Sequence, residues 1–246
     1  MSPRSLEWVL LAFFAWQFDH FQRQNLGLAA LAASSQRVRS LSHGERAALL
    51  LAGRAAAVAI LARPRFLGLS IEPGVDVLIP VAALVYALAA IAGVRALLSR
   101  SSDQRPGAVV AMYGLTFAFW LPVFVFSSPY AAVGGLVIAH GLQYLLLTTL
   151  VALGQPRDGQ RPRTLASAGV VAVMGGGLLS AVSHLHSSGP STRWLYGAYL
   201  GLVASHFVVD AGLWRLRDAF PRRFLAARLP YLVPSGRSVT DIGSTP

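Results

Sequence analysis

The chain has 246 residues, of which 54% are hydrophobic and only 13% are charged. This composition is too apolar for an ordinary soluble domain, and several uncharged runs of about twenty residues are typical of a polytopic membrane protein. The sequence contains neither Cys nor Lys, so its 21 basic residues are all Arg. Disulfides, thiolate metal ligands and a lysine nucleophile or Schiff base are therefore excluded. The net charge of +11 does not indicate nucleic acid, because the Arg residues are spread between the apolar runs.

The apolar runs predict an all-α integral-membrane bundle of about seven transmembrane helices. Helices are expected because the alternative in lipid is a closed barrel, whose strands would alternate polar and apolar residues. The expected spans are residues 6–32, 45–62, 76–98, 108–127, 129–153, 165–186 and 195–216. We expect residues 1–218 to form the transmembrane domain, and 219–246 to form an interfacial segment with a disordered tail.

The Arg residues between the spans predict the orientation of the chain. Fourteen of them fall in the segments 33–46, 99–107 and 154–164 or after residue 214, against four in the segments on the opposite side. Since cytoplasmic loops carry the excess of positive charge, the N-terminus is expected outside and the C-terminus in the cytoplasm. The expected location is therefore the inner (cytoplasmic) membrane.

The first span carries polar residues in the middle of an apolar run, in the segment WQFDHFQRQNLG. A charged group at the centre of a bilayer costs roughly 2.5–3.5 kcal/mol on insertion scales, so such residues normally face a partner, a cavity or an ion. The polar residues are Asp19, His20, Arg23 and Gln24. Asp19 and Arg23 are also spaced to form a simple neutralising pair.

Three histidines are expected at a similar depth in spans that run in the same direction. His20, His140 and His206 lie about 21, 16 and 16 Å below the expected outer edge, at about 1.5 Å per helical residue. Each has polar companions about one turn deeper. These companions are Arg23 and Gln24 for His20, Gln143 and Tyr144 for His140, and Asp210 for His206.

Three imidazoles with nearby carboxylates indicate a divalent transition metal, with iron favoured over zinc. The expected ligands are His20, His140 and His206, with Asp210 as a fourth ligand or general base. Arg23 and Tyr144 are the other candidate catalytic residues, and Asp19, Gln24 and Gln143 are expected to hold the cofactor or the substrate. The alternative is structural: polar side chains in membrane helices often only bond neighbouring helices, at about 0.6 kcal/mol per pair.

Two further polar motifs lie outside this layer. His184 and His186, in SHLHSS, fit either a solvated pair or a metal-binding pair at the outer end of span 165–186. Ser42 and Glu45 have the spacing of a capping box, which leaves the intervening His43 without a required function.

Three polar segments, DHFQRQNLG, HGLQYLLL and HFVVDAGLWRLRD, together resemble an uncharacterised family of bacterial polytopic membrane proteins. That family has an HxxRQ first helix, an HxxQY helix and a C-terminal HxxxDxxxWR helix. In general character the chain is also similar to histidine-rich membrane oxygenases of the carotene-dioxygenase type. Seven spans with His and Asp further resemble membrane zinc hydrolases of the ceramidase and adiponectin-receptor group. Those hydrolases carry HxxxH in the last helix, where this chain has His206 and Asp210.

The sequence therefore predicts a membrane-embedded, metal-dependent enzyme that acts on a lipophilic substrate, with iron-dependent oxidation as the leading hypothesis. A zinc-dependent membrane hydrolase is the alternative enzyme. Two non-enzymatic alternatives are a haem-binding electron carrier with His140 and His206 as axial ligands, and a proton-coupled transporter with Asp210 in a relay. The expected partners are the lipid bilayer and a small lipophilic molecule. The sequence gives neither the substrate nor the oligomeric state.

Overall fold

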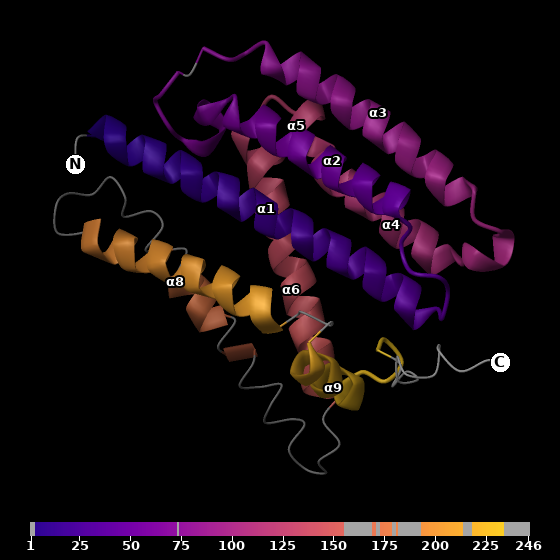
Figure 1. Cartoon of the computed structure of the whole chain (residues 1–246). Coiled ribbons are helices and arrows are strands. Elements are labelled where there is room, and N and C mark those ends of the chain that lie inside the picture. Colours follow the sequence, from indigo (N-terminus) through magenta and orange to yellow (C-terminus); the bar gives the residue numbers. More distant parts are fainter. Residues whose placement is uncertain are drawn as a thin grey trace. The chain divides into compact units, whose positions relative to one another are not determined.

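The computed structural model describes residues 3–72, 74–154, 169–170, 173–178, 181, 193–213 and 218–233. Within these ranges the regular secondary structure is entirely helical, as predicted. The helices are α1 (Pro3–Ser35), α2 (His43–Leu61), α3 (Leu78–Leu98), α4 (Gly107–Trp120), α5 (Pro122–Val125), α6 (Gly135–Leu153), α8 (Arg193–Leu213) and α9 (Ala219–Arg228) (Figure 1). The chain forms two compact units, Met1–Gln143 and Tyr144–Pro246, and the boundary between them falls within α6.

The predicted spans correspond closely to observed helices in most of the chain. Helices α1, α2, α3 and α8 match the spans at 6–32, 45–62, 76–98 and 195–216. The span at 108–127 is divided into α4 and α5, because Pro122 lacks the N–H that would continue the hydrogen-bond ladder. The span at 129–153 begins with a π-helical turn, Tyr130–Gly134, and continues as α6. The span at 165–186 and the predicted tail lie largely outside the described residues, as do His184 and His186.

Three of these stretches are long and apolar enough to cross a membrane: Leu78–Leu98, Gly107–Val125 and Tyr130–Leu153. Seven spans and the orientation of the termini stay predictions. Helix α1 has the required length, but it is less apolar because it carries Asp19, Arg23 and their polar neighbours.

Unit 1 is built around α2, which packs against α1, α3 and α4. In Figure 1, α1, α2 and α3 run side by side. The buried face of α2 is rich in alanine, and small side chains let neighbouring helices approach closely. These buried residues are Ala48, Ala52, Ala55, Ala56 and Ala59.

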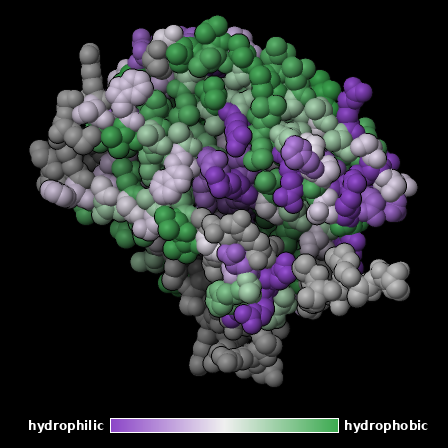
Figure 2. Space-filling model, viewed as in Figure 1, coloured by the Kyte–Doolittle hydropathy of each residue, from purple (hydrophilic) through white to green (hydrophobic). Residues whose placement is uncertain are grey.

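The outer face of α3 is apolar and exposed. In Figure 2 the upper part of the visible face, where α3 lies in Figure 1, is covered mostly by hydrophobic side chains. The exposed residues include Val81, Leu84, Leu88, Ile91 and Val94. An apolar surface of this length is typical of a helix that faces lipid.

Two loops meet at one end of unit 1, which we call the loop end (residues 36–42 and 99–106). Arg100 extends from the end of α3 and donates hydrogen bonds to the carbonyl oxygens of Arg39 and Ser40, at 2.8 and 3.0 Å. The backbone N–H of Arg39 donates to the side-chain oxygen of Gln104 at 2.8 Å. Both loops belong to the segments that the Arg distribution assigns to one side of the membrane, so their contact agrees with that assignment.

The loop end also contains a buried ion pair. The Nε and Nη2 atoms of Arg100 lie 2.5 and 2.6 Å from the two carboxylate oxygens of Glu45, and both side chains are inaccessible to solvent. Glu45 also completes the predicted capping box with Ser42, which the structure confirms. The hydrogen bond from Arg100 to Glu45 raises the pKa of the arginine still further, so both groups are charged at neutral pH.

Unit 2 contains the end of α6 together with α8 and α9. Gly154 follows α6 directly, and a Cβ atom at this position would lie 2.1 Å from the carbonyl oxygen of Arg228. The end of α6 and the end of α9 are therefore in close backbone contact. Helix α9 falls within the segment that the sequence predicts to be interfacial.

Candidate metal centre

Helix α1 carries its buried residues on one face. Phe18, Gln22, Asn25 and Ala29 recur every three or four residues and are almost completely buried. His20 is also buried, at 9% exposure, and lies beside this face. Of the polar residues that the sequence singles out in the first span, His20 is thus the one that lies inside the bundle.

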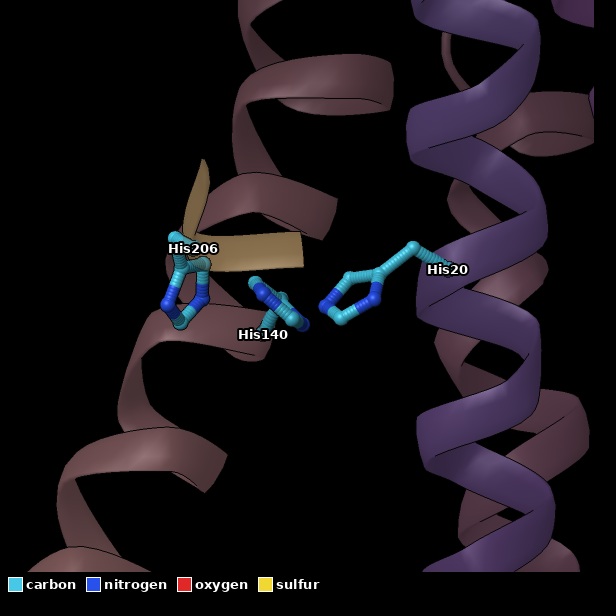
Figure 3. A group of neighbouring side chains, drawn as sticks. All are labelled: His20, His140 and His206. Carbon is cyan, nitrogen blue, oxygen red and sulfur yellow. The ribbon is translucent and has the colours of Figure 1, made fainter. Parts of the chain in front are cut away.

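His20 meets His140 of α6 within unit 1. The two ring centroids are 5.2 Å apart and the ring planes are nearly perpendicular, at 77°. His140 is 7% exposed, and the ring of Phe21 stacks on it with 4.2 Å between the centroids. In Figure 3 the ring of His20 points from α1 toward His140. The packing of α1 against α6 therefore places two buried imidazoles together.

A second polar group lies in unit 2 and includes His206, Asp210 and Tyr144. The Nε2 atom of His206 is 3.3 Å from Oδ2 of Asp210, one turn further along α8. The ring of Tyr144 meets the ring of His206 edge to face, with the centroids 4.8 Å apart. Asp210 is buried, whereas the His206 side chain is one-third exposed.

Helix α6 carries a residue of each group. His140 and Tyr144 are four residues apart on this continuous helix, so they share one face and are separated by about 6 Å along its axis. Tyr144 therefore follows His140 by about one helical turn on the same face of α6, which is the spacing that the sequence predicts.

His20, His140 and His206 each offer one imidazole nitrogen as a possible metal ligand. His20 and His140 belong to unit 1 and His206 belongs to unit 2, so a shared three-histidine site stays a prediction. Asp210 is not among these possible ligands. Its described contact is with the ring of His206. The roles predicted for Asp210, as a fourth ligand or a general base, stay predictions.

Asp19 and Arg23 bond to each other. Arg23 Nε lies 2.7 Å from Asp19 Oδ2, and the two side chains are 76% and 43% exposed respectively. This is the neutralising pair that the i,i+4 spacing allows, and it lies on the exposed side of α1. Gln24 is half-buried beside it. The catalytic role predicted for Arg23 stays a prediction, as do the cofactor- or substrate-binding roles predicted for Asp19 and Gln24.

Two buried amides on α1 were not singled out by the sequence. Gln22 donates to the carbonyl oxygen of Leu49 at 2.8 Å and accepts from the indole N–H of Trp120 at 2.6 Å. Asn25 accepts from Gln143 of α6 at 3.1 Å. The signal that could have identified them is their position, because residues 18, 22, 25 and 29 continue one helical face.

Comparison with known protein families, with curated proteins and with solved structures gives no significant match. The function is therefore argued from the site.

Proposed function

We propose that this protein is a membrane-embedded enzyme that binds a divalent transition metal through His20, His140 and His206 and acts on a lipophilic substrate. The observation that carries the proposal is the His20–His140 pair of unit 1, two buried imidazoles from α1 and α6 whose ring centroids are 5.2 Å apart. A metal ion would give this pair a function. His206 of α8, which contacts Tyr144 and Asp210 in unit 2, would supply the third imidazole.

The environment of the His20–His140 pair favours neutral imidazoles. Two protonated rings with centroids 5.2 Å apart would repel each other, and burial beside Phe21 would make each charge costly. Neutral imidazole is the form that ligates a metal, and it is the commonest nitrogen ligand in proteins. The pair is therefore better suited to hold a cation than to carry charge itself.

Asp210 would orient the third ligand. Metal-binding histidines usually donate their second ring N–H to a carboxylate or carbonyl, which fixes the tautomer and raises the basicity of the ligating nitrogen. The contact between His206 Nε2 and Asp210 Oδ2, at 3.3 Å, has this form. With Nε2 bonded to the carboxylate, Nδ1 of His206 would be the nitrogen available to the metal.

The chemistry we favour is iron-dependent oxidation of a lipophilic molecule. A three-histidine set leaves coordination positions open, and iron in such a set would supply oxidative chemistry. The apolar side chains around the pair, including Phe18, Phe21 and Leu136, would exclude water and accommodate a hydrocarbon substrate. The chain's own contribution is to position the three imidazoles and to provide this dry surrounding.

Zinc-dependent hydrolysis is the second candidate, and one feature of the group favours it. The proposed ligands are three imidazoles without a carboxylate. Three neutral ligands leave the full charge of the cation in place, which favours polarisation of a carbonyl group and ionisation of a bound water. Tyr144 and Asp210 would then lie close enough to the third imidazole to assist proton transfer.

The identity of the metal in freshly purified protein decides between these candidates. Elemental analysis should find iron, and the iron-loaded protein should consume oxygen when membrane lipid extract is added. Zinc with release of free fatty acid would instead support the hydrolase. A Soret band would identify haem, and protein without any transition metal would reject both enzymatic candidates.

A further inference from the structure

Asn25 and Gln143 form an amide pair that joins α1 to α6. Nε2 of Gln143 donates to Oδ1 of Asn25 at 3.1 Å. Asn25 is completely buried, at 0% exposure. This pair lies entirely within unit 1, in the same α1–α6 contact that holds His20 and His140.

Each amide has one buried polar atom left over. Nδ2 of Asn25 and Oε1 of Gln143 are inaccessible to solvent and have no hydrogen-bond partner among the residues that the structure describes. The result does not depend on how the two amides are turned. If both are flipped, Asn25 donates to Gln143, and the pair again retains one unused NH2 group and one unused carbonyl oxygen.

A purely structural amide on the same helix behaves differently. Gln22 is three residues before Asn25 and is also buried, but its nitrogen and its oxygen both have protein partners. Buried polar groups in folded proteins are normally paired in this way. The unused donor and acceptor of the Asn25–Gln143 pair therefore indicate a polar occupant that the described part of the chain does not supply.

The pair is close to the histidines along both helices. Asn25 is five residues after His20 on α1, and Gln143 is three residues after His140 on α6. At about 1.5 Å per residue these separations are about 7.5 and 4.5 Å along the respective axes. A molecule bound at the amides would thus have another part of its structure next to the His20–His140 pair.

We propose that Asn25 and Gln143 bind the polar group of the lipophilic substrate. The group must donate one hydrogen bond and accept another, which selects a hydroxyl, a carboxamide or a protonated carboxylic acid on a hydrocarbon body. A permanently charged head group is disfavoured, because both amides are neutral and their unused polar atoms are buried. This inference rests on the proposed function, since it assigns the substrate class of the same site.

The test uses the full-length purified protein, its metal content measured on each sample, and two probes of equal chain length, 1-dodecanol and dodecane. Wild-type protein should bind dodecanol roughly tenfold more tightly than dodecane, the difference expected for about one net hydrogen bond.

The double variant Asn25→Leu/Gln143→Met keeps the approximate shape and removes both amides. It should lose the preference for the alcohol and melt at the same or a higher temperature, because no buried amide is left unpaired. Gln22→Met is the matched control, and it should lower the melting temperature and keep the preference.

Equal affinity of the wild-type protein for the two probes would overturn the inference, since an ordered water would then be the occupant. A double variant that melts well below the wild type but keeps the alcohol preference would also overturn it, by making the pair structural. These failures are distinguishable from failure of the proposed function. If the wild-type protein holds metal but shows no preference for the alcohol, only the proposed substrate class is rejected. If it prefers the alcohol but holds no metal, only the proposal of a metalloenzyme is rejected.

Discussion

The imidazole of His20 meets that of His140 edge to face, with 5.2 Å between the ring centroids, and Phe21 stacks on the second ring at 4.2 Å. This relationship joins the first helix of the chain to α6. The contact brings two polar residues of apolar helices together as a pair that is suited to bind a cation. The predictions below test the pair, the residues around it and the scaffold that holds it.

Asp210 is predicted to orient His206 and not to stabilise the fold. Asp210→Asn keeps the shape of the side chain and removes its charge, so we expect metal affinity to fall by about 10- to 100-fold, as for other residues that support a ligand. The melting temperature should change little. Asp19→Asn is the matched control, because Asp19 bonds Arg23 on the exposed side of α1. A fully metallated but strongly destabilised Asp210→Asn protein would show that Asp210 is structural.

The ion pair at the loop end is predicted to be essential for stability. Glu45→Gln leaves the Arg100 guanidinium buried without a countercharge, so the free energy of unfolding should fall by about 3–5 kcal/mol. The control is Glu72→Gln, which removes the partner of Arg65 in an exposed ion pair and should cost no more than about 1 kcal/mol. Chemical denaturation in detergent measures both. Equal effects of the two substitutions would contradict the prediction.

The same pair predicts that stability falls on acidification. Burial alone would raise the pKa of Glu45, but hydrogen bonds from Arg100 and from the backbone and side chain of Ser42 outweigh it, so the pKa is lowered. A carboxyl group with a depressed pKa in the folded state contributes stability that is present above its unfolded value and is lost as the pH falls through the folded value. The melting temperature of the wild type should therefore decrease in acid. Glu45→Gln should show a weaker decrease over the same range.

Close packing between α1 and α2 is predicted to depend on Gly53. A Cβ atom there would lie 1.9 Å from Oε1 of Gln22, which is bonded to Trp120. Gly53→Ala should therefore displace the Gln22 amide and lower the free energy of unfolding by about 1–3 kcal/mol. Gly27→Ala in α1 is the control, since a Cβ atom there has no atom within 4 Å, and it should be neutral or slightly stabilising. A neutral Gly53→Ala variant would show that the amide can move freely.

Much of the helical fold could be predicted from the sequence, because apolar runs and Pro residues mark helices and their ends directly. The three histidines could be selected because imidazoles are rare in membrane helices and their depths could be compared. Sequence could not show that Arg23 lies on the exposed side of α1, since the direction of a helical face depends on what packs against it. It also missed Asn25 and Gln22, whose importance depends on partners in other helices. Arg100 was counted only as a loop charge, and its pairing with Glu45 required the fold of the α1–α2 loop.

The orientation of the chain is predicted from its Arg residues. The contact between the loops at residues 36–42 and 99–106 agrees with their assignment to one side. A topology reporter fused after Arg223 should therefore read cytoplasmic, and one fused before Leu6 should read external. Reporters that read the same side at both positions would reject the seven-span arrangement, and the helix count would have to be even.

The metal content of single histidine variants tests the central claim most directly. Wild-type protein purified in detergent should hold about one divalent transition-metal ion per chain, as a mononuclear three-histidine site would. His20→Ala, His140→Ala and His206→Ala should each lose most of this metal and remain folded. His43→Ala is the matched control, because His43 is exposed at the start of α2 outside the group, and it should keep its metal. Full metal content in all three site variants, or no metal in the wild type, would contradict the account.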